Sequence, residues 1–461
     1  MRLLALSLGC VGIAVAATAE KPATFNKDVL PVLQKNCQTC HRPGEVAPMS
    51  FLNYQETRPW AKAIKTAVLS KKMPPWFADA KYGHFQNQRA LTEAEIKTLS
   101  SWADNGAPEG DAKDKPAPLQ FTQGWNIKPD ITVEMPNTFE VPASGILEYQ
   151  YIVVPTKFEK DTWISAAEVR PGNRAVMHHV IVYVRPPGSA YMKDAKPGIP
   201  YVPFQYERDA NGAAIRRIPQ APAPQPATGD APRPPAPAAN PAAGMASVEL
   251  LTAYAPGLQA QRFDLPIAET AKLIPAGSDL VFQLHYTTNG KPGTDKTKVG
   301  LTVAAQPPKY RHVTANATTM DFVIPPNDPN YETHSAVTFN EDARLVWLMP
   351  HMHVRGKDFL YKAVYPTGET DTLLNVPKYD FNWQIGYEEA TPLVLPKGTR
   401  IECTAHHDNS ANNPNNPNPN ASVRWGDQTW EEMMMGFFGV VVPVDVQPQN
   451  VLVRPQRRAT P

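Results

Sequence analysis

The sequence predicts a mainly β protein that is preceded by a small all-α domain. Two amphipathic segments, 25–36 and 91–106, have helical spacing, and Thr92 with Glu95 forms a capping box before the second. After residue 122 come short runs rich in β-branched and aromatic residues, bounded by Pro and Gly, as in antiparallel sandwiches or barrels. A chain of 461 residues is too long for a single core, so two or three domains are expected.

The amino terminus has the features of a secretory signal. Residues 1–19 combine a basic start, a mostly apolar stretch and the small-residue cleavage site Ala17-Thr18-Ala19. Attachment of a lipid through Cys10 is the less favoured alternative, because its apolar stretch is very short. No later stretch has the apolar length of a membrane span, and a net charge of +1 does not favour nucleic acid. We therefore expect a protein of the periplasm or a secreted one.

The cysteines point to a haem. Removing the signal leaves Cys37, Cys40 and Cys403, too few for a disulfide framework. The first two belong to Cys37-Gln38-Thr39-Cys40-His41, a C-x-x-C-H motif in which the thiols form thioethers to the porphyrin and the imidazole reaches the iron. A disulfide loop with an incidental histidine is the alternative. Export favours covalent haem c, which is attached outside the cytoplasm.

The segment around this motif resembles small class I cytochrome c domains, over residues 25–110. The resemblance implies a methionine opposite His41. Met73, in "SKKMPPWFAD", fits best because two prolines stiffen the loop that holds its sulfur. Met49 and His84 are alternatives. We assign 20–110 to this domain and 111–122, which is Pro-rich and charged, to a linker.

The remainder of the chain alternates apolar runs with turn residues. The runs expected to be strands are "GILEYQYIVV", "RAVMHHVIVYV", "DLVFQLHYTT", "RLVWLMPHMHV" and "DFLYKAVY". Two interruptions lack the composition of a core. A Pro/Ala-rich insertion covers about 208–245, and residues 408–420, "DNSANNPNNPNPN", are expected to form an exposed loop.

Histidines gather in four places in this part of the chain. They are His178-His179, His285, His351-x-His353 and His406-His407. Residues two apart in a strand point to the same face, so the pair in "HMHV" should converge on one point. The adjacent pair in "MHHV" can bind one ion only where the strand bulges. The segment "WEEMMMGFF" adds methionine thioethers to these imidazoles, and no thiolate is nearby. This combination favours copper over zinc, because methionine sulfur suits Cu(I) and zinc seldom takes it.

Residues from about 125 to 445 resemble the copper type II, ascorbate-dependent monooxygenases, the family of peptidylglycine α-hydroxylating and dopamine β-monooxygenase. The matching pieces are "MHHV", "QLHYTTNG", "HMHVRGK" and "GDQTWEEMM", in the family's order. The resemblance implies two copper-binding β-sandwich, jelly-roll-like subdomains that face a solvent-filled cleft. We place them at 123–304 and 305–461.

The resemblance also implies two ligand sets. The electron-transfer copper would be bound by His178, His179 and His285. The oxygen-binding copper would be bound by His351, His353 and the methionine after the Glu-Glu pair, Met433, with Met434 and Met435 adjacent to it.

Some positions depart from the family. Met434 stands where a cysteine commonly follows the copper methionine, and Cys403 has no obvious partner. His406 and His407 are expected to be loop residues or, alternatively, to support a copper ligand from behind. Arg355 is expected either near the oxygen-binding copper or as an exposed structural residue.

The sequence therefore predicts an exported copper monooxygenase with two coppers and one covalent haem c. The reaction implied is hydroxylation of a C–H bond in a small organic or peptide substrate by O₂. An electron donor to the haem, or an ascorbate-like reductant, would supply the electrons. The alternative is a non-catalytic periplasmic protein that binds copper or transfers electrons.

Overall fold

The computed structural model describes residues 22–121, 124–203, 206–208, 214–216, 247–256 and 258–453. The chain divides into two compact units, and each is described by itself. The smaller unit holds residues up to 43, 47–74 and 91–119, and the larger holds 44–46, 75–90 and the chain from 120. The predicted signal, 1–19, and most of the insertion predicted at about 208–245 lie outside the described residues.

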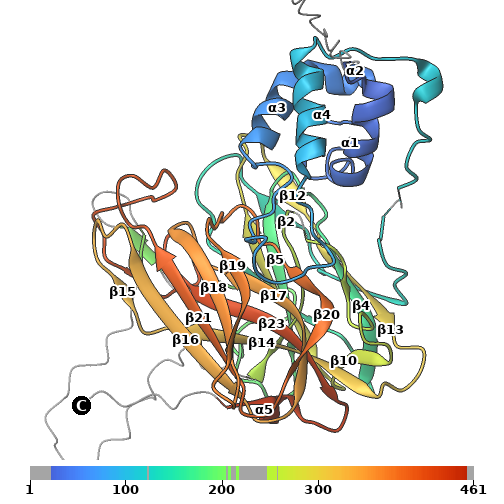
Figure 1. Cartoon of the computed structure of the whole chain (residues 1–461). Coiled ribbons are helices and arrows are strands. Elements are labelled where there is room, and N and C mark those ends of the chain that lie inside the picture. Colours follow the sequence, from blue (N-terminus) through green and yellow to red (C-terminus); the bar gives the residue numbers. More distant parts are fainter. Residues whose placement is uncertain are drawn as a thin grey trace, which may run out of the picture. The chain divides into compact units, whose positions relative to one another are not determined.

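The smaller unit is helical (Figure 1). Its helical elements are η1 (Phe25–Val29), α1 (Leu30–Asn36), α2 (Tyr54–Thr57), η2 (Arg58–Trp60), α3 (Ala61–Leu69), α4 (Glu93–Asp104) and η3 (Ala112–Asp114). The predicted capping box is confirmed, because the Thr92 side chain accepts from the Glu95 N–H and the Glu95 side chain accepts from the Thr92 N–H. Leu33, Leu99 and Trp102 are fully buried in the core of this unit.

The larger unit is made of β-sheets, which confirms the predicted mainly β class. Its first strands are β1 (Ile131–Glu134), β2 (Phe139–Val141), β3 (Gln150–Pro155), β4 (Thr162–Arg170), β5 (Met177–Arg185), β6 (Tyr206–Arg208), β7 (Ala214–Arg216), β8 (Glu249–Tyr254), β9 (Gln261–Arg262), β10 (Thr270–Ile274), β11 (Asp279–Tyr286), β12 (Gly293–Asp295) and β13 (Lys298–Val303). Four of them form a sheet in the order β3-β11-β5-β8.

The carboxyl-terminal strands form a second group. They are β14 (Tyr310–Thr319), β15 (Val323–Ile324), β16 (Tyr331–Phe339), β17 (Ala343–His351), β18 (Gly356–Val364), β19 (Thr370–Val376), β20 (Tyr387–Leu395), β21 (Arg400–His407), β22 (Val423–Arg424), β23 (Met434–Pro443) and β24 (Leu452–Val453), with the short helix α5 (Pro448–Val451). One sheet runs β19-β18-β21-β16-β24. A nine-stranded sheet, β1-β13-β4-β10-β14-β23-β17-β20 with β9 beside β4, joins the two groups through the β10–β14 pair.

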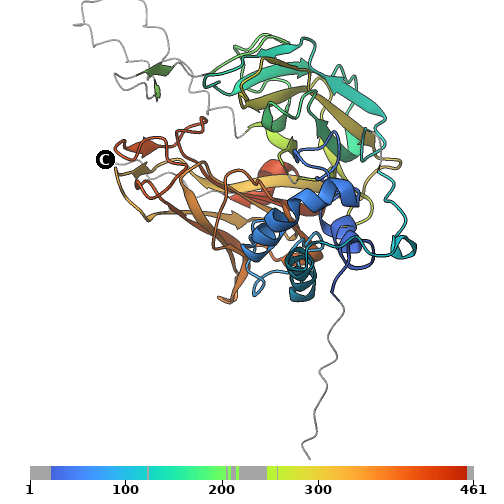
Figure 2. The same ribbon diagram turned by 90° about the horizontal axis from the view of Figure 1, so that it is seen from above.

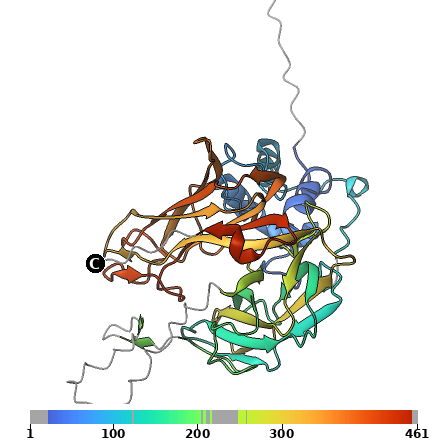
Figure 3. The same cartoon turned by 90° about the horizontal axis from the view of Figure 1, so that it is seen from below.

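The four-stranded sheet is buried on both faces. Side chains alternate along a strand, so Val182 and Phe282 enter the core of the amino-terminal strands. Tyr183 and Val281 instead enter the core that includes the carboxyl-terminal strands. Figures 2 and 3 show the two strand groups side by side, teal to olive for the first and orange to red for the second. Strands β5 and β11, which carry His178, His179 and His285, are therefore anchored by packing on both faces.

In the part of the chain that the structure describes, no helix has the length and apolar character needed to cross a membrane.

Candidate metal sites

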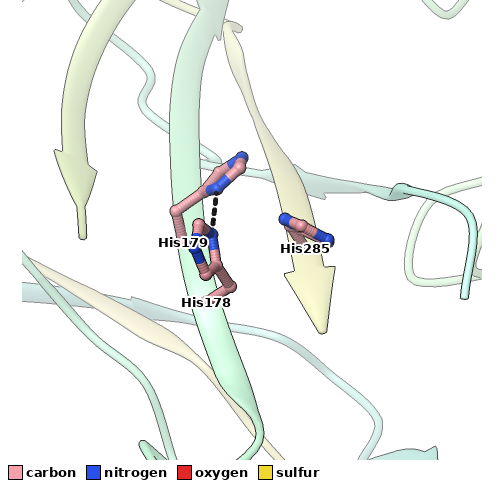
Figure 4. A group of neighbouring side chains, drawn as sticks. All are labelled: His178, His179 and His285. Atoms are coloured by element: carbon pink, nitrogen blue, oxygen red, sulfur yellow. Dashed lines mark hydrogen bonds between the residues drawn. The ribbon is translucent and has the colours of Figure 1, made fainter. Parts of the chain in front are cut away.

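Three histidines of the four-stranded sheet meet at one point. His178 and His179 lie on β5, and His285 lies on the neighbouring strand β11 (Figure 4). His285 pairs with His179, but the next residue, Tyr286, pairs with Met177, so His178 is an extra residue in a bulge. The bulge lets both adjacent histidines turn toward His285. Ligand nitrogens of all three lie within 4.8 Å of one another.

The nitrogens of this set have the properties of free ligands. His178 Nε2, His179 Nε2 and His285 Nδ1 are buried and have no hydrogen-bond partner. The remaining nitrogens of the adjacent pair contact each other, with 2.9 Å between the two Nδ1 atoms. Burial lowers the pKa of His178 to about 4 and holds the pKa values of His179 and His285 well below 6.5. The imidazoles are therefore neutral, as metal binding requires.

The second predicted set lines a small cavity. His351 is the last residue of β17, His353 follows it by two residues, and Met433 directly precedes β23. All three line a cavity of about 20 Å³, together with His179 of the first set. Because main-chain pairing of β17 with β23 sets His351 opposite Met435, the sheet itself brings the "HMH" and "MMM" segments together.

Hydrogen bonds fix the tautomers of the second set. His351 Nδ1 lies 2.8 Å from Gln384 Oε1, and His353 Nδ1 lies 3.2 Å from the Glu431 carbonyl oxygen. Since both partners accept, each Nδ1 carries the proton and each Nε2 keeps its lone pair. His353 Nε2 is buried without a partner. Both rings are thus oriented to bind a metal through Nε2.

The three consecutive methionines face different ways. Met433 and Met435 line the cavity. Met434 does not, and its sulfur instead accepts a 3.3 Å hydrogen bond from Ser335 Oγ on β16. The structure leaves Met433 and Met435 as the thioethers beside His351 and His353.

A buried carboxylate supports the second set, and the sequence did not identify it. Glu432 accepts the main-chain N–H groups of His353, Arg355 and Met433 at 2.9, 2.6 and 3.1 Å. Burial opposes its charge, but His407, His353 and Arg355 nearby lower the Glu432 pKa to about 2. The charged Glu432 therefore fixes the main chain on both sides of the site. Its place after Glu431 in "WEEMM" was the only available signal.

Three expectations near this carboxylate need correction. Of the two alternatives for Arg355, the exposed one is wrong: the residue is 1% exposed, and its Nε donates to Asn409 Oδ1 at 2.7 Å. Asn409 is fully buried, although the polar composition of 408–420 predicted exposure throughout. His406 and His407 are not loop residues, because both lie on β21. His407 is buried with its Nδ1 at 3.6 Å from Glu432, and His406 contacts Asp358.

Two aromatic rings lie between the histidine sets. The Tyr149 ring centroid lies 4.5 Å from that of His285 and 6.4 Å from that of His353. The Phe381 ring lies 5.0 Å from His178 and 6.1 Å from His353. The resemblance implies a solvent-filled cleft between the two coppers. Here the sets share a cavity that is barely larger than a water molecule requires.

The C-x-x-C-H segment continues directly from α1. The N–H groups of Cys40 and His41 both donate to the Cys37 carbonyl oxygen, which forms a helical turn. His41 Nδ1 lies 3.3 Å from the Met49 carbonyl oxygen, and its ring stacks on Phe51 at 4.3 Å. The Met49 carbonyl therefore accepts a hydrogen bond from the Nδ1–H group, which leaves the Nε2 lone pair available to a metal.

The candidates for the second iron ligand differ in their surroundings. Met49 packs against the core of the helical unit. Met73 is half-buried in the same unit and is not part of that core. His84 belongs to the larger unit. The packing role of Met49 favours Met73 for the ligand position.

No protein-family model and no curated protein matches the sequence. Among solved structures, PNGF-II is similar with a TM-score of 0.28 and 10% identity, over 68% of this chain and 65% of that one, so the match spans less than two thirds of PNGF-II. The infectious bursal disease virus Gx strain gives a TM-score of 0.17 and 9% identity, over 69% and 72%. Similarities at this level carry no argument about function.

Proposed function

We propose that the chain is an exported, copper-dependent monooxygenase with a covalent haem c in its helical unit. The observation that carries the proposal is a set of buried imidazole nitrogens without partners. They occur on both histidine sets, at His178 Nε2, His179 Nε2, His285 Nδ1 and His353 Nε2. A buried polar atom without a partner is costly, so it points to a ligand. The thioether of Met433 beside two imidazoles favours copper, because Met suits Cu(I).

The protein contributes orientation and exclusion of water. Bound copper would supply the one-electron steps and the oxygen chemistry by which R–H, O₂, two electrons and two protons give R–OH and water. Gln384 and the Glu431 carbonyl hold the second pair of imidazoles with Nε2 toward the cavity. Tyr149 and Phe381 fill the space between the sets, which keeps bulk water from the ligands.

The helical unit would contribute the haem. Cys37 and Cys40 would form the thioethers, and His41, through Nε2, and Met73, through its sulfur, would bind the iron. The orientation of His41 by the Met49 carbonyl supports this assignment. A haem tethered to the chain would deliver the single electrons that hydroxylation needs.

Metal content tests the proposal. Protein from a host with haem-maturation machinery should contain one haem and two coppers. His285→Ala and His351→Ala should each lose about one copper, while His334→Ala, an exposed histidine outside both sets, should keep both. Stoichiometric zinc with no affinity for copper would overturn the proposal. Oxygen consumption that depends on added organic substrate separates an enzyme from a copper carrier.

A further inference from the structure

The larger unit contains a second cavity beside the candidate metal sites. Its volume is about 260 Å³, which is room for a small organic molecule and far more than the cavity at the histidines offers. Leu250 and Ala253 of β8 line it, with Trp347 and Met349 of β17 and three residues of the segment 86–89. Nothing in the metal-binding proposal uses this space.

Strand register shows that the two cavities are adjacent. Leu250, which lines the second cavity, pairs with Tyr183, which lines the first. Met349, in the second, pairs with Phe437, in the first. Directly paired residues have side chains about 5 Å apart on the same face. Met349 also lies two residues before His351, or about 7 Å along the strand.

The charged groups around the second cavity are already compensated. Arg262 donates two hydrogen bonds to Asp264, at 2.9 and 2.7 Å. Glu388 accepts a 3.0 Å hydrogen bond from Gln86 and is attracted electrostatically by Arg89. A charged ligand would have to compete with these pairs, so the lining favours an uncharged one.

One imidazole that lines the cavity has a buried nitrogen without a hydrogen-bond partner. His312 lines the cavity, is 3% exposed, and its Nδ1 makes no hydrogen bond. Burial and the ammonium group of Lys272 hold the His312 pKa well below 6.5, so the imidazole is neutral. Lys272 itself is held by Glu249 and by Thr314 Oγ1. A neutral imidazole suits a hydroxyl or carbonyl group rather than a carboxylate.

We propose that this second cavity binds an uncharged, amphipathic organic molecule, whose apolar body lies against Trp347 and Met349 and whose hydroxyl or carbonyl group hydrogen-bonds to His312. This inference rests on the proposed function: molecules of this kind are the substrate class, and the end of the substrate remote from His312 faces His351. Gln86, Asn87 and Arg89 form part of its wall.

Three matched probes test the charge preference on metal-free, full-length protein by calorimetric titration: p-cresol, 4-methylbenzoate and 4-methylbenzylamine. We expect p-cresol to bind at one site and at least tenfold more tightly than either charged probe. Ala253→Phe, which fills the cavity, should weaken p-cresol at least tenfold. Ala260→Phe, on a loop lining the same cavity, replaces it if the strand variant does not fold.

Two further variants test the polar contact. His312→Phe keeps a ring and removes the hydrogen bond, so p-cresol should bind about fivefold more weakly, as loss of one net hydrogen bond predicts. His334→Phe, on β16, should change nothing. Equal or tighter binding of 4-methylbenzoate, or p-cresol binding that neither cavity-filling variant weakens, would overturn the proposal. Because copper is absent from these titrations, their result is independent of the metal analysis that tests the proposed function.

Discussion

The main-chain N–H of Tyr149 donates a 2.9 Å hydrogen bond to the Gln428 side chain. This bond ties the start of β3 to the segment that leads into Met433. The Tyr149 ring continues the link, because it packs against His285 on one side and faces His353 on the other. Tyr149, which directly precedes β3, therefore spaces the two histidine sets, although 279 positions separate it from Gln428 in the chain.

Truncating the Tyr149 ring should lower the stability of the protein. Tyr149→Ala removes a fully buried ring and should lower the free energy of unfolding by about 3–5 kcal/mol. Tyr149→Phe keeps the ring and loses only a long contact to Thr429, so about 1 kcal/mol or less is expected. Urea unfolding measures the free energy of unfolding of both variants. Equal losses in the two variants would show that the hydroxyl, not the ring, holds the sets apart.

The sequence was most informative where local pattern decides structure. The β-rich runs became β3, β5, β11, β17 and β18, and Thr92 capped α4. The requirement that His178 and His179 share an ion only across a bulge is met at that position. In each case, period-2 alternation or cap chemistry acts within a few residues, so it can be predicted without knowing the tertiary structure.

Long-range contacts could not be predicted in this way. Asn409 lies in a run of turn residues and is nevertheless fully buried, because it accepts from Arg355 and its amide donates to the Pro325 and Ala421 carbonyls. Tyr149 and Phe381 belong to no motif, and their place between the histidine sets depends on how whole sheets pack. Composition favours exposure for an Asn-rich loop, and tertiary hydrogen bonding overrides it.

The direction of each methionine excludes Met434 as a ligand of the proposed copper. In Cu(I)-loaded protein, Met433→Leu should lose or shift the infrared band of bound carbon monoxide, because it removes the soft sulfur beside His351 and His353. Met434→Leu is the matched control and should leave the band unchanged, since that sulfur contacts Ser335. His285→Ala should also preserve it. A shift in Met435→Leu alone would move the ligand to the other methionine at the cavity.

The buried imidazoles make the metal-free protein acid-sensitive. Burial lowers the pKa of His178 and of His353 to about 4 in the folded state, against 6.5 for an ordinary histidine. As pH falls from about 6.5 to 4, the unfolded chain binds protons that the folded chain does not, so stability falls. Each of these two imidazoles should lower the free energy of unfolding by up to about 3 kcal/mol over that pH window. Urea unfolding of His353→Leu should show a shallower slope there; an unchanged slope would contradict its assignment as a buried neutral group.

The haem assignment predicts a contrast between two methionines of the helical unit. Met73→Ala should lower the reduction potential by on the order of 0.1 V or open a coordination position, since axial ligands set haem potentials over a range of about 0.8 V. Met49→Ala should mainly destabilise the unit, because Met49 packs against its core. Spectroelectrochemistry with thermal unfolding separates the two effects. A change of potential in Met49→Ala alone would reverse the assignment.

The carboxylate of Glu432 should be required for the geometry of the second histidine set. Glu432→Gln keeps the shape but removes the charge that receives three main-chain N–H groups beside Arg355 and His407. Leaving those buried groups without their anion should lower the free energy of unfolding by about 3–5 kcal/mol. The variant should also weaken Cu(I) binding at His351, His353 and Met433 while sparing the His285 set, because the Glu432 side chain positions the main chain of only the former.

Glu332→Gln, which changes an exposed carboxylate beside His406, is the matched control and should change neither the free energy of unfolding nor the Cu(I) affinity appreciably. Competitive chelator titration measures the affinities, and a Glu432→Gln variant with unchanged copper affinity at both sets would show that the imidazoles need no support from this residue.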